Sequence, residues 1–447
     1  MKPLFAVLIG SLLGAPSVQA WASMPDGTWV KHAALKVEDE VVRIRRQIHQ
    51  HPELGNQEFQ TAQLVAKQLR ELGIEVRTGI ARTGVVGVLK GGKPGPVMGL
   101  RADMDALPVQ EQTGLPFASN TVAQYQGKSS PVMHACGHDA HTAMLLGAAR
   151  LLAEHREQVA GTVVFIFQPA EEGGADIDNF TQGAEVGARK MIAEGVLTDP
   201  PIEALFGLHV VAGIPTGELR YRPGATMNSA DGVRISLQGV QAHGSMPWKS
   251  KDPVVAAAQV VTSLQTLVSR RADLTQGMAA VTIGSIHGGT APNVIPQDLT
   301  MLGTLRTSNN DIRKTLLGDL PNLVEHIALA HGVAPKVELS EYAPVLMNDP
   351  ALTQAMVTAL QRASDGKAAR LDYTFSASED FAHYATQVPS LFVLLGATPA
   401  GQDMSSAPVN HSPSFTVDEA TLSTGVRAHV EFVLAYPAYA QARQAVR

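Results

Sequence analysis

The feature that most constrains the fold is a series of short, almost uninterrupted apolar runs that alternate with amphipathic helical segments. Three such runs are "GTVVFIFQ" at 161–168, "ALFGLHV" at 204–210 and "SLFVLLGA" at 390–397. Strands that are buried on both faces are continuously apolar, whereas strands with one solvated face alternate between apolar and polar residues. The pattern therefore predicts an α/β fold in which helices cover both faces of a mostly parallel sheet.

The pattern changes near Asn228. From 228 to 341 the predicted elements run in the order β-α-β-β-α-β, with one long helix in "DPVVAAAQVVTSLQTLVSRR" and another in "IRKTLLGDLPNLVEHIALAHG". That order is the split βαβ arrangement of ferredoxin-like domains. We therefore predict that 228–341 is an inserted domain, and that 35–227 and 342–440 together form one discontinuous larger domain.

The first residues, "MKPLFAVLIGSLLGAPSVQAWAS", have the pattern of a secretory signal. Lys2 supplies a short positive region, residues 4–15 are apolar, and small-x-small cleavage patterns end at Ala20 and Ala22. The apolar stretch is too short for a stable membrane span. Residues 1–22 are therefore predicted to be a signal peptide. The mature protein is expected to be soluble and secreted, or periplasmic in a Gram-negative source.

Charge and cysteine usage narrow the choice of partners. The net charge is −6 and the isoelectric point is about 6.2, and binding to nucleic acid or anionic membranes would need clustered Lys and Arg. We expect no nucleic-acid partner, and no membrane association after removal of the signal. Cys136 is the only cysteine, so it cannot form an intramolecular disulfide. In an exported protein it is a metal ligand, a reactive thiol, an intermolecular partner or a buried inert residue.

Five motifs rich in metal-binding side chains fall where strands of the larger domain are predicted to end. They are "RADMDALP" (101–108), "HACGHDAH" (134–141), "QPAEEGG" (168–174), "GLHV" (207–210) and "NHSP" (410–413). Histidine and cysteine bind zinc and similar metals, and carboxylates add charge and can bridge two ions. Open α/β sheets bind ligands outside the carboxyl ends of their strands. The joint occurrence of these motifs predicts a metal site at that edge.

Two adjacent glutamates, Glu171 and Glu172, suggest two separate roles. Neighbouring side chains point in different directions, so one can bind metal while the other acts as general base on a water that the metal activates. Two alternatives remain open from the residues alone. One is a cysteine amidase with Cys136 as nucleophile and His138 as base. The other is a non-catalytic protein that binds metal.

The same motifs resemble the aminoacylase/carboxypeptidase family of dinuclear metallopeptidases over residues 35–440. The resemblance is strongest to its amidohydrolase branch, which contains indole-acetyl-amino-acid hydrolases and hippurate hydrolases. It rests on the five motifs together with "SEDF" (378–381). It implies two divalent ions (zinc, manganese or cobalt), and the implied ligands are Cys136, His138, Glu172, His209 and His411. It further implies that Cys136 bridges the ions, that Glu171 is the general base and that Asp105 orients a ligand histidine.

The resemblance also implies roles for the inserted domain, as a lid and a dimerisation domain. His243 would polarise the scissile carbonyl, sometimes across a homodimer, while Asn293 and Arg306 would hold the substrate. The implied activity is hydrolysis of the amide bond of N-acyl-L-amino acids, and the alternative is a metallo-carboxypeptidase or dipeptidase acting on short peptides. The polar loop after "EEGG" and the position of Trp248 near His243 depart from the expected pattern, so the acyl group stays undefined.

Overall fold

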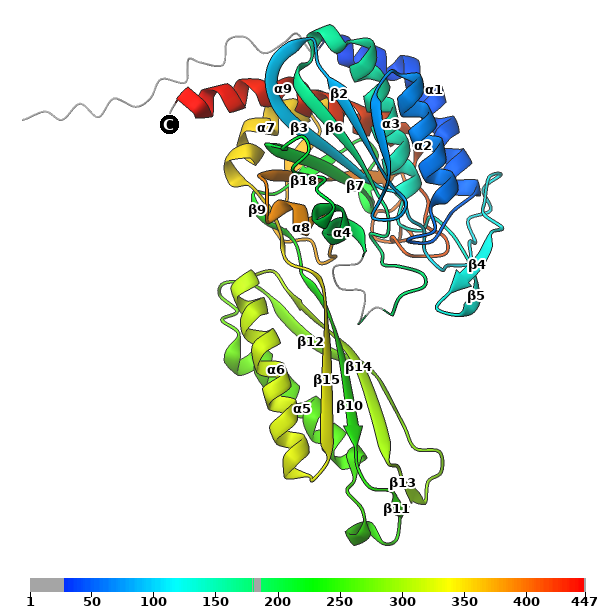
Figure 1. The fold of residues 1–447 in the computed structure, drawn as a ribbon, viewed down its shortest axis with the longest axis vertical. Helices are drawn as coiled ribbons and strands as arrows, with labels where there is room; N and C mark the ends of the chain where they lie inside the picture. The colour runs from blue at the N-terminus through cyan, green and yellow to red at the C-terminus, as the bar shows by residue number, and fades with distance from the viewer. Residues whose placement is uncertain (1–27, 179, 181–185, 446–447) are drawn as a thin grey trace, which may run out of the picture.

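The computed structural model describes residues 28–178, 180 and 186–445. Over these residues the chain forms a large-sheet unit, built on an eight-stranded sheet, and a small-sheet unit that projects from it (Figure 1). The predicted signal peptide, residues 1–22, lies outside the described part. Among the described helices, none is both long enough and apolar enough to cross a membrane.

The large sheet has a parallel centre and antiparallel additions. Its strands run in the order β1-β2-β6-β3-β7-β18-β8-β17. The strands are β1 (Glu75–Ile80), β2 (Gly84–Lys90), β3 (Lys93–Asp103), β6 (Ala160–Gln168), β7 (Ala204–Pro215), β8 (Leu219–Tyr221), β17 (Ala368–Arg370) and β18 (Ser390–Thr398). Strands β6, β3, β7 and β18 are parallel to one another, and β17 is parallel to β8; the pairs β1–β2, β2–β6 and β18–β8 are antiparallel. The predicted α/β fold with a mostly parallel sheet is confirmed.

Helices cover both faces of this sheet. They are α1 (Thr28–Gln50), α2 (Phe59–Glu71), α3 (His138–Glu154), α4 (Gly187–Ala193), α7 (Pro350–Ala363), α8 (Ala382–Ala385) and α9 (Leu422–Ala445). Helices α1, α2, α3, α7 and α9 pack on one face, and α4 and α8 pack on the other. In β6, Phe165 and Phe167 are buried against the first group while Val164 and Ile166 are buried against the second. This two-sided burial explains the continuous apolar runs.

The small-sheet unit is an antiparallel sheet with two helices on one face. Its elements are β10 (Ala230–Gln238), α5 (Pro253–Arg271), β12 (Ala279–Gly288), β14 (Asp298–Thr307), α6 (Asn310–Ala330) and β15 (Ala334–Ala343). The strand order is β12-β14-β10-β15. Val233, Ile235 and Leu237 alternate along β10 and are buried beneath the helices. Asp252 and Asn309 begin the two helices, because each side chain accepts hydrogen bonds from backbone N–H groups of the first turn.

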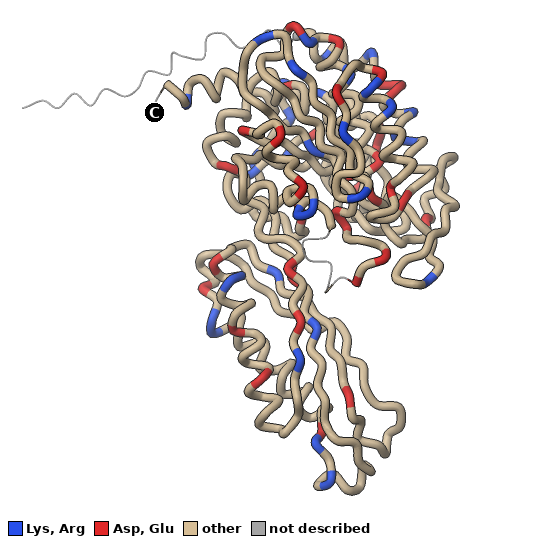
Figure 2. The backbone as a smooth tube through the Cα atoms, viewed as in Figure 1, with Lys and Arg blue, Asp and Glu red and all other residues tan. Residues whose placement is uncertain are grey.

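The two units are joined through neighbouring strands. Strands β10 and β15 pair with each other and run along the length of the small-sheet unit (Figure 1). At its far end, β11 (Ala242–His243) pairs with β13 (Val294–Ile295). The remaining short strands are β4 (Val122–Tyr125), β5 (Lys128–Pro131), β9 (Gly224–Met227) and β16 (Leu346–Asn348). Figure 2 shows acidic and basic residues interspersed through both units of the described chain.

Candidate active site

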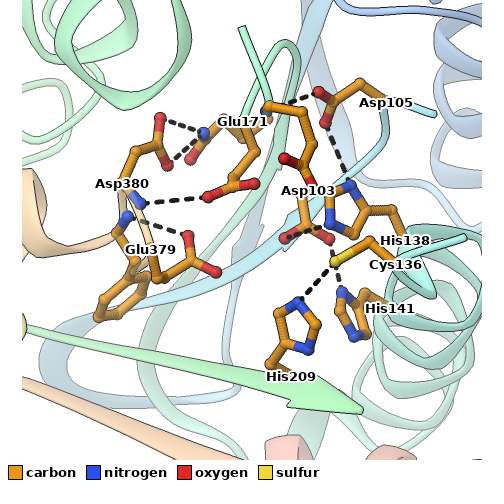
Figure 3. A network of polar contacts seen from close by, with 12 residues as sticks. Asp103, Asp105, Cys136, His138, His141, Glu171, His209, Glu379 and Asp380 are labelled. Carbon is orange, nitrogen blue, oxygen red and sulfur yellow. Dashed lines mark hydrogen bonds and ion pairs between the residues drawn. The ribbon is translucent and has the colours of Figure 1, made fainter. Parts of the chain in front are cut away.

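Four of the five predicted metal-binding motifs are seen to meet at one edge of the large sheet in Figure 3, which labels Asp105, Cys136, Glu171 and His209 among their residues. Asp103 ends β3 and is in register with Gln168, the last residue of β6. Glu171 lies in the loop that follows β6, and His209 lies on β7, on the other side of β3. Helix α3 begins at His138 beside them. The carboxyl ends of parallel strands and the start of a helix therefore enclose a single site, as is usual in open α/β sheets.

The structure brings all five predicted ligands together. The Sγ atom of Cys136 lies 3.2 Å from Nε2 of His209 and 3.2 Å from Nε2 of His411. Nε2 of His411 lies 2.9 Å from Oε1 of Glu172. Cys136 belongs to two groups of ligand atoms that each lie within 4.8 Å: one adds His138 and His209, the other Glu172 and His411; Glu171 forms a further group with His138 and Glu172. This shared thiol is the geometry that a bridging ligand requires.

Neighbouring groups fix the orientation of the ligand histidines. Nδ1 of His138 lies 3.2 Å from Oδ1 of Asp105, while its Nε2 is buried without a hydrogen-bond partner among the described residues. Nδ1 of His209 donates to the carbonyl oxygen of Val210 at 2.7 Å, which leaves the Nε2 lone pair facing Cys136. Ligand histidines commonly use their second nitrogen in this way. Asp105 therefore occupies the place predicted for a residue that orients a ligand.

The electrostatics of the cluster favour a bound cation. Burial alone would lower the pKa of His138, but Asp103 and Asp105 outweigh this effect and raise that pKa to about 10. Burial and the carboxylate of Glu172 raise the pKa of the Cys136 thiol well above its usual value. These shifts describe a buried pocket with excess negative charge, which divalent ions would neutralise. Sulfur, imidazole and carboxylate donors together suit zinc, manganese or cobalt, so the residues fit the implied ions.

The same geometry argues against a cysteine nucleophile. A nucleophilic thiol needs an adjacent base that is itself oriented by a third group. The predicted base, His138, points one nitrogen at Asp105, whereas the described hydrogen-bond partners of the thiol are His209 and His411. The structure gives this alternative no support.

Two unusual backbone conformations hold the ligand loops. Gly137 has a φ of 97°, and a Cβ atom at this position would lie 2.3 Å from Cγ2 of Val210. Only glycine satisfies both conditions at the start of α3. His411 has a φ of 70°, which is uncommon for a residue with a side chain, and its N–H donates to the carbonyl of Ala135 at 2.7 Å. Such conformations concentrate at functional sites, where the surrounding structure enforces them.

The predicted general base lies beside the ligands. Glu171 is 4% exposed, and its Oε1 accepts hydrogen bonds from the backbone N–H of Asp380 at 3.2 Å and from the hydroxyl of Tyr342 at 2.9 Å. Burial raises the pKa of Glu171 well above its usual value, and the carboxylates of Glu379 and Glu172 add to the shift. A buried carboxyl with a raised pKa in a cleft is typical of an acid–base catalyst.

A cavity of about 670 Å³ opens from the cluster toward the small-sheet unit. Its lining includes Glu171 and His209 on one side and Arg306 of β14 on the other. The Arg306 guanidinium donates to the hydroxyl of Ser378 at 2.8 Å and to the hydroxyl of Thr304 at 3.0 Å. The structure thus places this predicted substrate-binding residue in the same cavity as the metal ligands.

The other two predicted lid residues lie elsewhere. His243 belongs to β11, and Asn293 directly precedes β13, so both lie at the far end of the small-sheet unit (Figure 1). The N–H of Gly244 donates to the carbonyl of Asn293 at 2.7 Å, and the N–H of Ser245 donates to Nδ1 of His243 at 3.1 Å. The described lining of the cavity includes neither residue. Within one chain, the structure brings them to each other but not to the metal ligands.

Sequence reasoning missed three residues of the site. Nδ1 of His141 lies 2.6 Å from Oδ1 of Asp103, whose other oxygen lies 3.7 Å from Nε2 of His138. Tyr342 contacts Glu171 from β15. Two of the three had a signal: His141 lies three residues after His138 on one helix face, and Asp103 lies two residues before Asp105 on an extended segment. Nothing in the sequence marks Tyr342.

The buried carboxyl of Glu58, which contacts the loop that carries Glu171 and Glu172, is expected to make the stability of the protein depend on pH. Glu58 is 0% exposed; its carboxyl accepts hydrogen bonds from the N–H of Ala170 at 2.8 Å and from the hydroxyl of Thr83 at 2.5 Å. Burial, with a contribution from Asp105, raises its pKa from 4.5 to about 8. Between these values the folded state binds a proton that the unfolded state has lost. The free energy of unfolding therefore falls as pH rises through this window.

Glu58→Gln is expected to remove this part of the pH dependence, because the amide has the shape of the neutral carboxyl and does not ionise. Urea unfolding at pH 5 and pH 8 should show a smaller loss of stability in the variant than in the wild type. Glu71→Gln, which changes an exposed carboxylate on α2, is the control and should leave the dependence unchanged. An equal loss in the wild type and Glu58→Gln would show that Glu58 is ionised in the folded protein.

Comparison with known sequences agrees with this geometry. Residues 99–435 match the family model for peptidase family M20/M25/M40. N-acetyl-L-cysteine deacetylase of Bacillus subtilis is 38% identical, over 86% of this chain and 85% of the relative. Thermostable carboxypeptidase 1 of Saccharolobus solfataricus is 36% identical, over 90% and 96%. An IAA-amino acid hydrolase of Arabidopsis thaliana is 37% identical, over 90% and 86%.

Solved structures give the same result. A protein from methicillin-resistant Staphylococcus aureus has a TM-score of 0.80 at 35% identity, over 91% of this chain and 99% of its own. A Bacillus subtilis protein described as a dinuclear metal-binding peptidase of the M20 family has a TM-score of 0.71 at 32% identity, over 90% and 99%. The family match covers most of the chain, and the curated relatives align over 85% or more of their length. The chain therefore belongs to peptidase family M20/M25/M40 and is a hydrolase.

Proposed function

We propose that this protein hydrolyses the amide bond of N-acyl-L-amino acids and releases a carboxylic acid and a free amino acid. One observation carries the proposal: four of the five clustered metal-binding side chains and the buried Glu171 line the same cavity as Arg306. Relatives named as an N-acetyl-L-cysteine deacetylase and an IAA-amino acid hydrolase support this substrate class.

Two divalent ions fit the donor set. Cys136 would bridge them, with His138 and His209 in one group of ligands and Glu172 and His411 in the other. The dinuclear relative from Bacillus subtilis supports the number of ions, and zinc, manganese and cobalt are the proposed metals. When bound, such ions would lower the pKa of the attacking water and polarise the scissile carbonyl.

The chain's own residues account for the proton transfers. As the water oxygen forms its bond to the amide carbon, Glu171 accepts the proton from that oxygen. When the C–N bond breaks, Glu171 returns the proton to the leaving nitrogen, so the carboxylate is regenerated. Arg306 is suited to pair with the free carboxylate of the amino acid, because a guanidinium binds a carboxylate through two parallel hydrogen bonds.

The small-sheet unit, residues 228–341, is proposed to be a ferredoxin-like lid and dimerisation domain inserted in a catalytic domain of residues 35–227 and 342–440. Because His243 and Asn293 lie far from the cavity of their own chain, a homodimer in which a second copy supplies them would complete the site. The Ser245 N–H bond to Nδ1 of His243 leaves Nε2–H as a donor for the developing oxyanion. Residues 1–22 are proposed to direct export to the periplasm or medium.

A carboxypeptidase or dipeptidase acting on short peptides is the second candidate. It is favoured by the 36% identity to a thermostable carboxypeptidase. Both reactions cleave an amide bond next to a free carboxylate, so Arg306 would serve either substrate. The described cavity, with its mixed polar and apolar lining, admits both.

Amino-acid release from a panel of N-acyl amino acids and dipeptides tests the proposal. The protein without residues 1–22 would be loaded with manganese, zinc or cobalt, with a chelated sample as control. Release from N-acyl amino acids that falls about 100-fold or more on chelation is the expected result. Release from dipeptides alone would establish the peptidase, and no release from any substrate by protein with two bound ions would refute both activities.

A further inference from the structure

Tyr342 reaches the proposed general base from the other unit of the molecule. It lies on β15, one of the two strands that join the units, and its hydroxyl lies 2.9 Å from Oε1 of Glu171. The hydroxyl also lies against the backbone carbonyl oxygen of Glu171. A phenol has one hydrogen, so it donates to one of these acceptors at a time. In both arrangements the donor is held next to the carboxylate.

The backbone of Tyr342 is fixed by the segment that supplies the second donor to Glu171. Nε2 of His383, on α8, lies 2.8 Å from the carbonyl oxygen of Tyr342. Burial lowers the pKa of His383 to about 4, so the neutral ring donates through Nε2–H at neutral pH. Three residues earlier, the N–H of Asp380 donates to Oε1 of Glu171 at 3.2 Å. Two donors from separate elements therefore converge on one oxygen.

This convergence leaves the other oxygen of the carboxylate for chemistry. The Glu171 side chain accepts two hydrogen bonds from the described residues, and both reach Oε1. Oε2 is therefore available to accept a proton from water. Tyr342 itself lines the cavity. Burial, followed by the charge of Glu171, raises the pKa of Tyr342 well above its usual value, so the phenol stays a donor.

We propose that Tyr342 is a positioning residue that orients the carboxylate of Glu171. Because Tyr342 lies on β15, the orientation of that carboxylate then depends on the position of the small-sheet unit relative to the large-sheet unit. The inference rests on the proposed function, because it assigns Tyr342 a role in that reaction. A buried tyrosine hydroxyl usually finds some partner, so a purely structural role is the alternative. The two roles differ in which kinetic constant Tyr342→Phe changes, because a residue that only supports the fold would not lower kcat selectively.

Tyr342→Phe is the direct test, with Tyr384→Phe as its matched control. Tyr384 is also a buried tyrosine, on α8, but its hydroxyl has no hydrogen-bond partner among the described residues and does not line the cavity. In the metal-loaded enzyme, Tyr342→Phe is expected to lower kcat by about tenfold to 100-fold, the effect of losing one hydrogen bond to a charged group. KM should change by less than about threefold, because substrate binding is retained. Tyr384→Phe should match the wild type.

A double-mutant cycle on metal-free protein provides a readout that does not need activity. Urea unfolding of the wild type, Tyr342→Phe, Glu171→Ala and the double variant should show non-additive changes, since the two side chains are in contact. Additive changes would overturn the inference. So would a Tyr342→Phe variant that keeps full kcat in an active enzyme, or one that loses metal or raises only KM. A wild type that is inactive on every substrate would instead refute the proposed function, and the inference with it.

Discussion

Replacing Glu171 with glutamine is expected to lower kcat by about 100- to 10,000-fold, the range that a positioned acid–base group contributes. Glutamine keeps the size of the side chain, and its Oε1 can still accept from Tyr342 and from the N–H of Asp380. It cannot accept and return a proton. The substitution therefore removes the proton transfer while the cavity and the ligand cluster are preserved. Steady-state kinetics with the best substrate of the panel would measure the effect.

The neighbouring glutamate provides the matched control. Glu172→Gln changes the same functional group one residue away, but this carboxylate lies 2.9 Å from Nε2 of His411 and belongs to the ligand cluster. Its replacement should lower the metal content measured by mass spectrometry, whereas Glu171→Gln should retain both ions. If Glu171→Gln kept near-normal turnover with two ions bound, the general base would have to be another group. If it lost metal, Glu171 would be a ligand.

The fold was predictable because burial leaves a direct trace in the sequence. Phe165 and Val164 face opposite helix layers, so the strand they share cannot alternate between apolar and polar residues. The ligand set was implied by the resemblance to a family, since position relative to strands and helices does not mark every member: His411 lies in a loop between β18 and α9. Elements that were not predicted lack a continuous run of apolar residues. Strand β1 (Glu75–Ile80) is only partly buried and contains no apolar run.

Contacts between distant segments could not be predicted. Tyr342 meets Glu171 only because β15 returns from the small-sheet unit at the edge where β6 ends. His243 gives the opposite case. A motif identified this residue, but the fold places it at the end of the small-sheet unit that is remote from the cavity. Local sequence determines which elements form, whereas the geometry of the chain crossing determines which side chains meet.

Arg101 also makes contacts between segments that are distant in the sequence, since it pairs with Glu379 and Asp380. Its guanidinium is 1% exposed and forms ion pairs with Asp103 at 2.7 Å, Glu379 at 2.9 Å and Asp380 at 3.1 Å. It also donates to the side-chain oxygen of Gln168 at 2.9 Å. Burial raises the pKa of Asp380 to about 8 even beside the arginine, so Arg101 opposes the cost of burying Asp380, whereas Asp103 also has His141 at 2.6 Å. Asp380 in turn supplies the N–H that contacts Glu171, so the cluster supports the proposed general base.

Arg101→Met should therefore destabilise the protein by about 3–5 kcal/mol at pH 7, because it leaves buried carboxylates without a counter-charge. The remaining carboxyls would keep their protons to higher pH in the folded state than in the unfolded state, so the loss should grow as pH rises from 5 to 8. Arg77→Met breaks an ion pair with the exposed Asp199 and should cost about 1 kcal/mol or less. Urea unfolding of the three proteins would measure both effects. Equal losses of stability in Arg101→Met and Arg77→Met would mean that water, rather than Arg101, compensates the charges of the buried carboxylates.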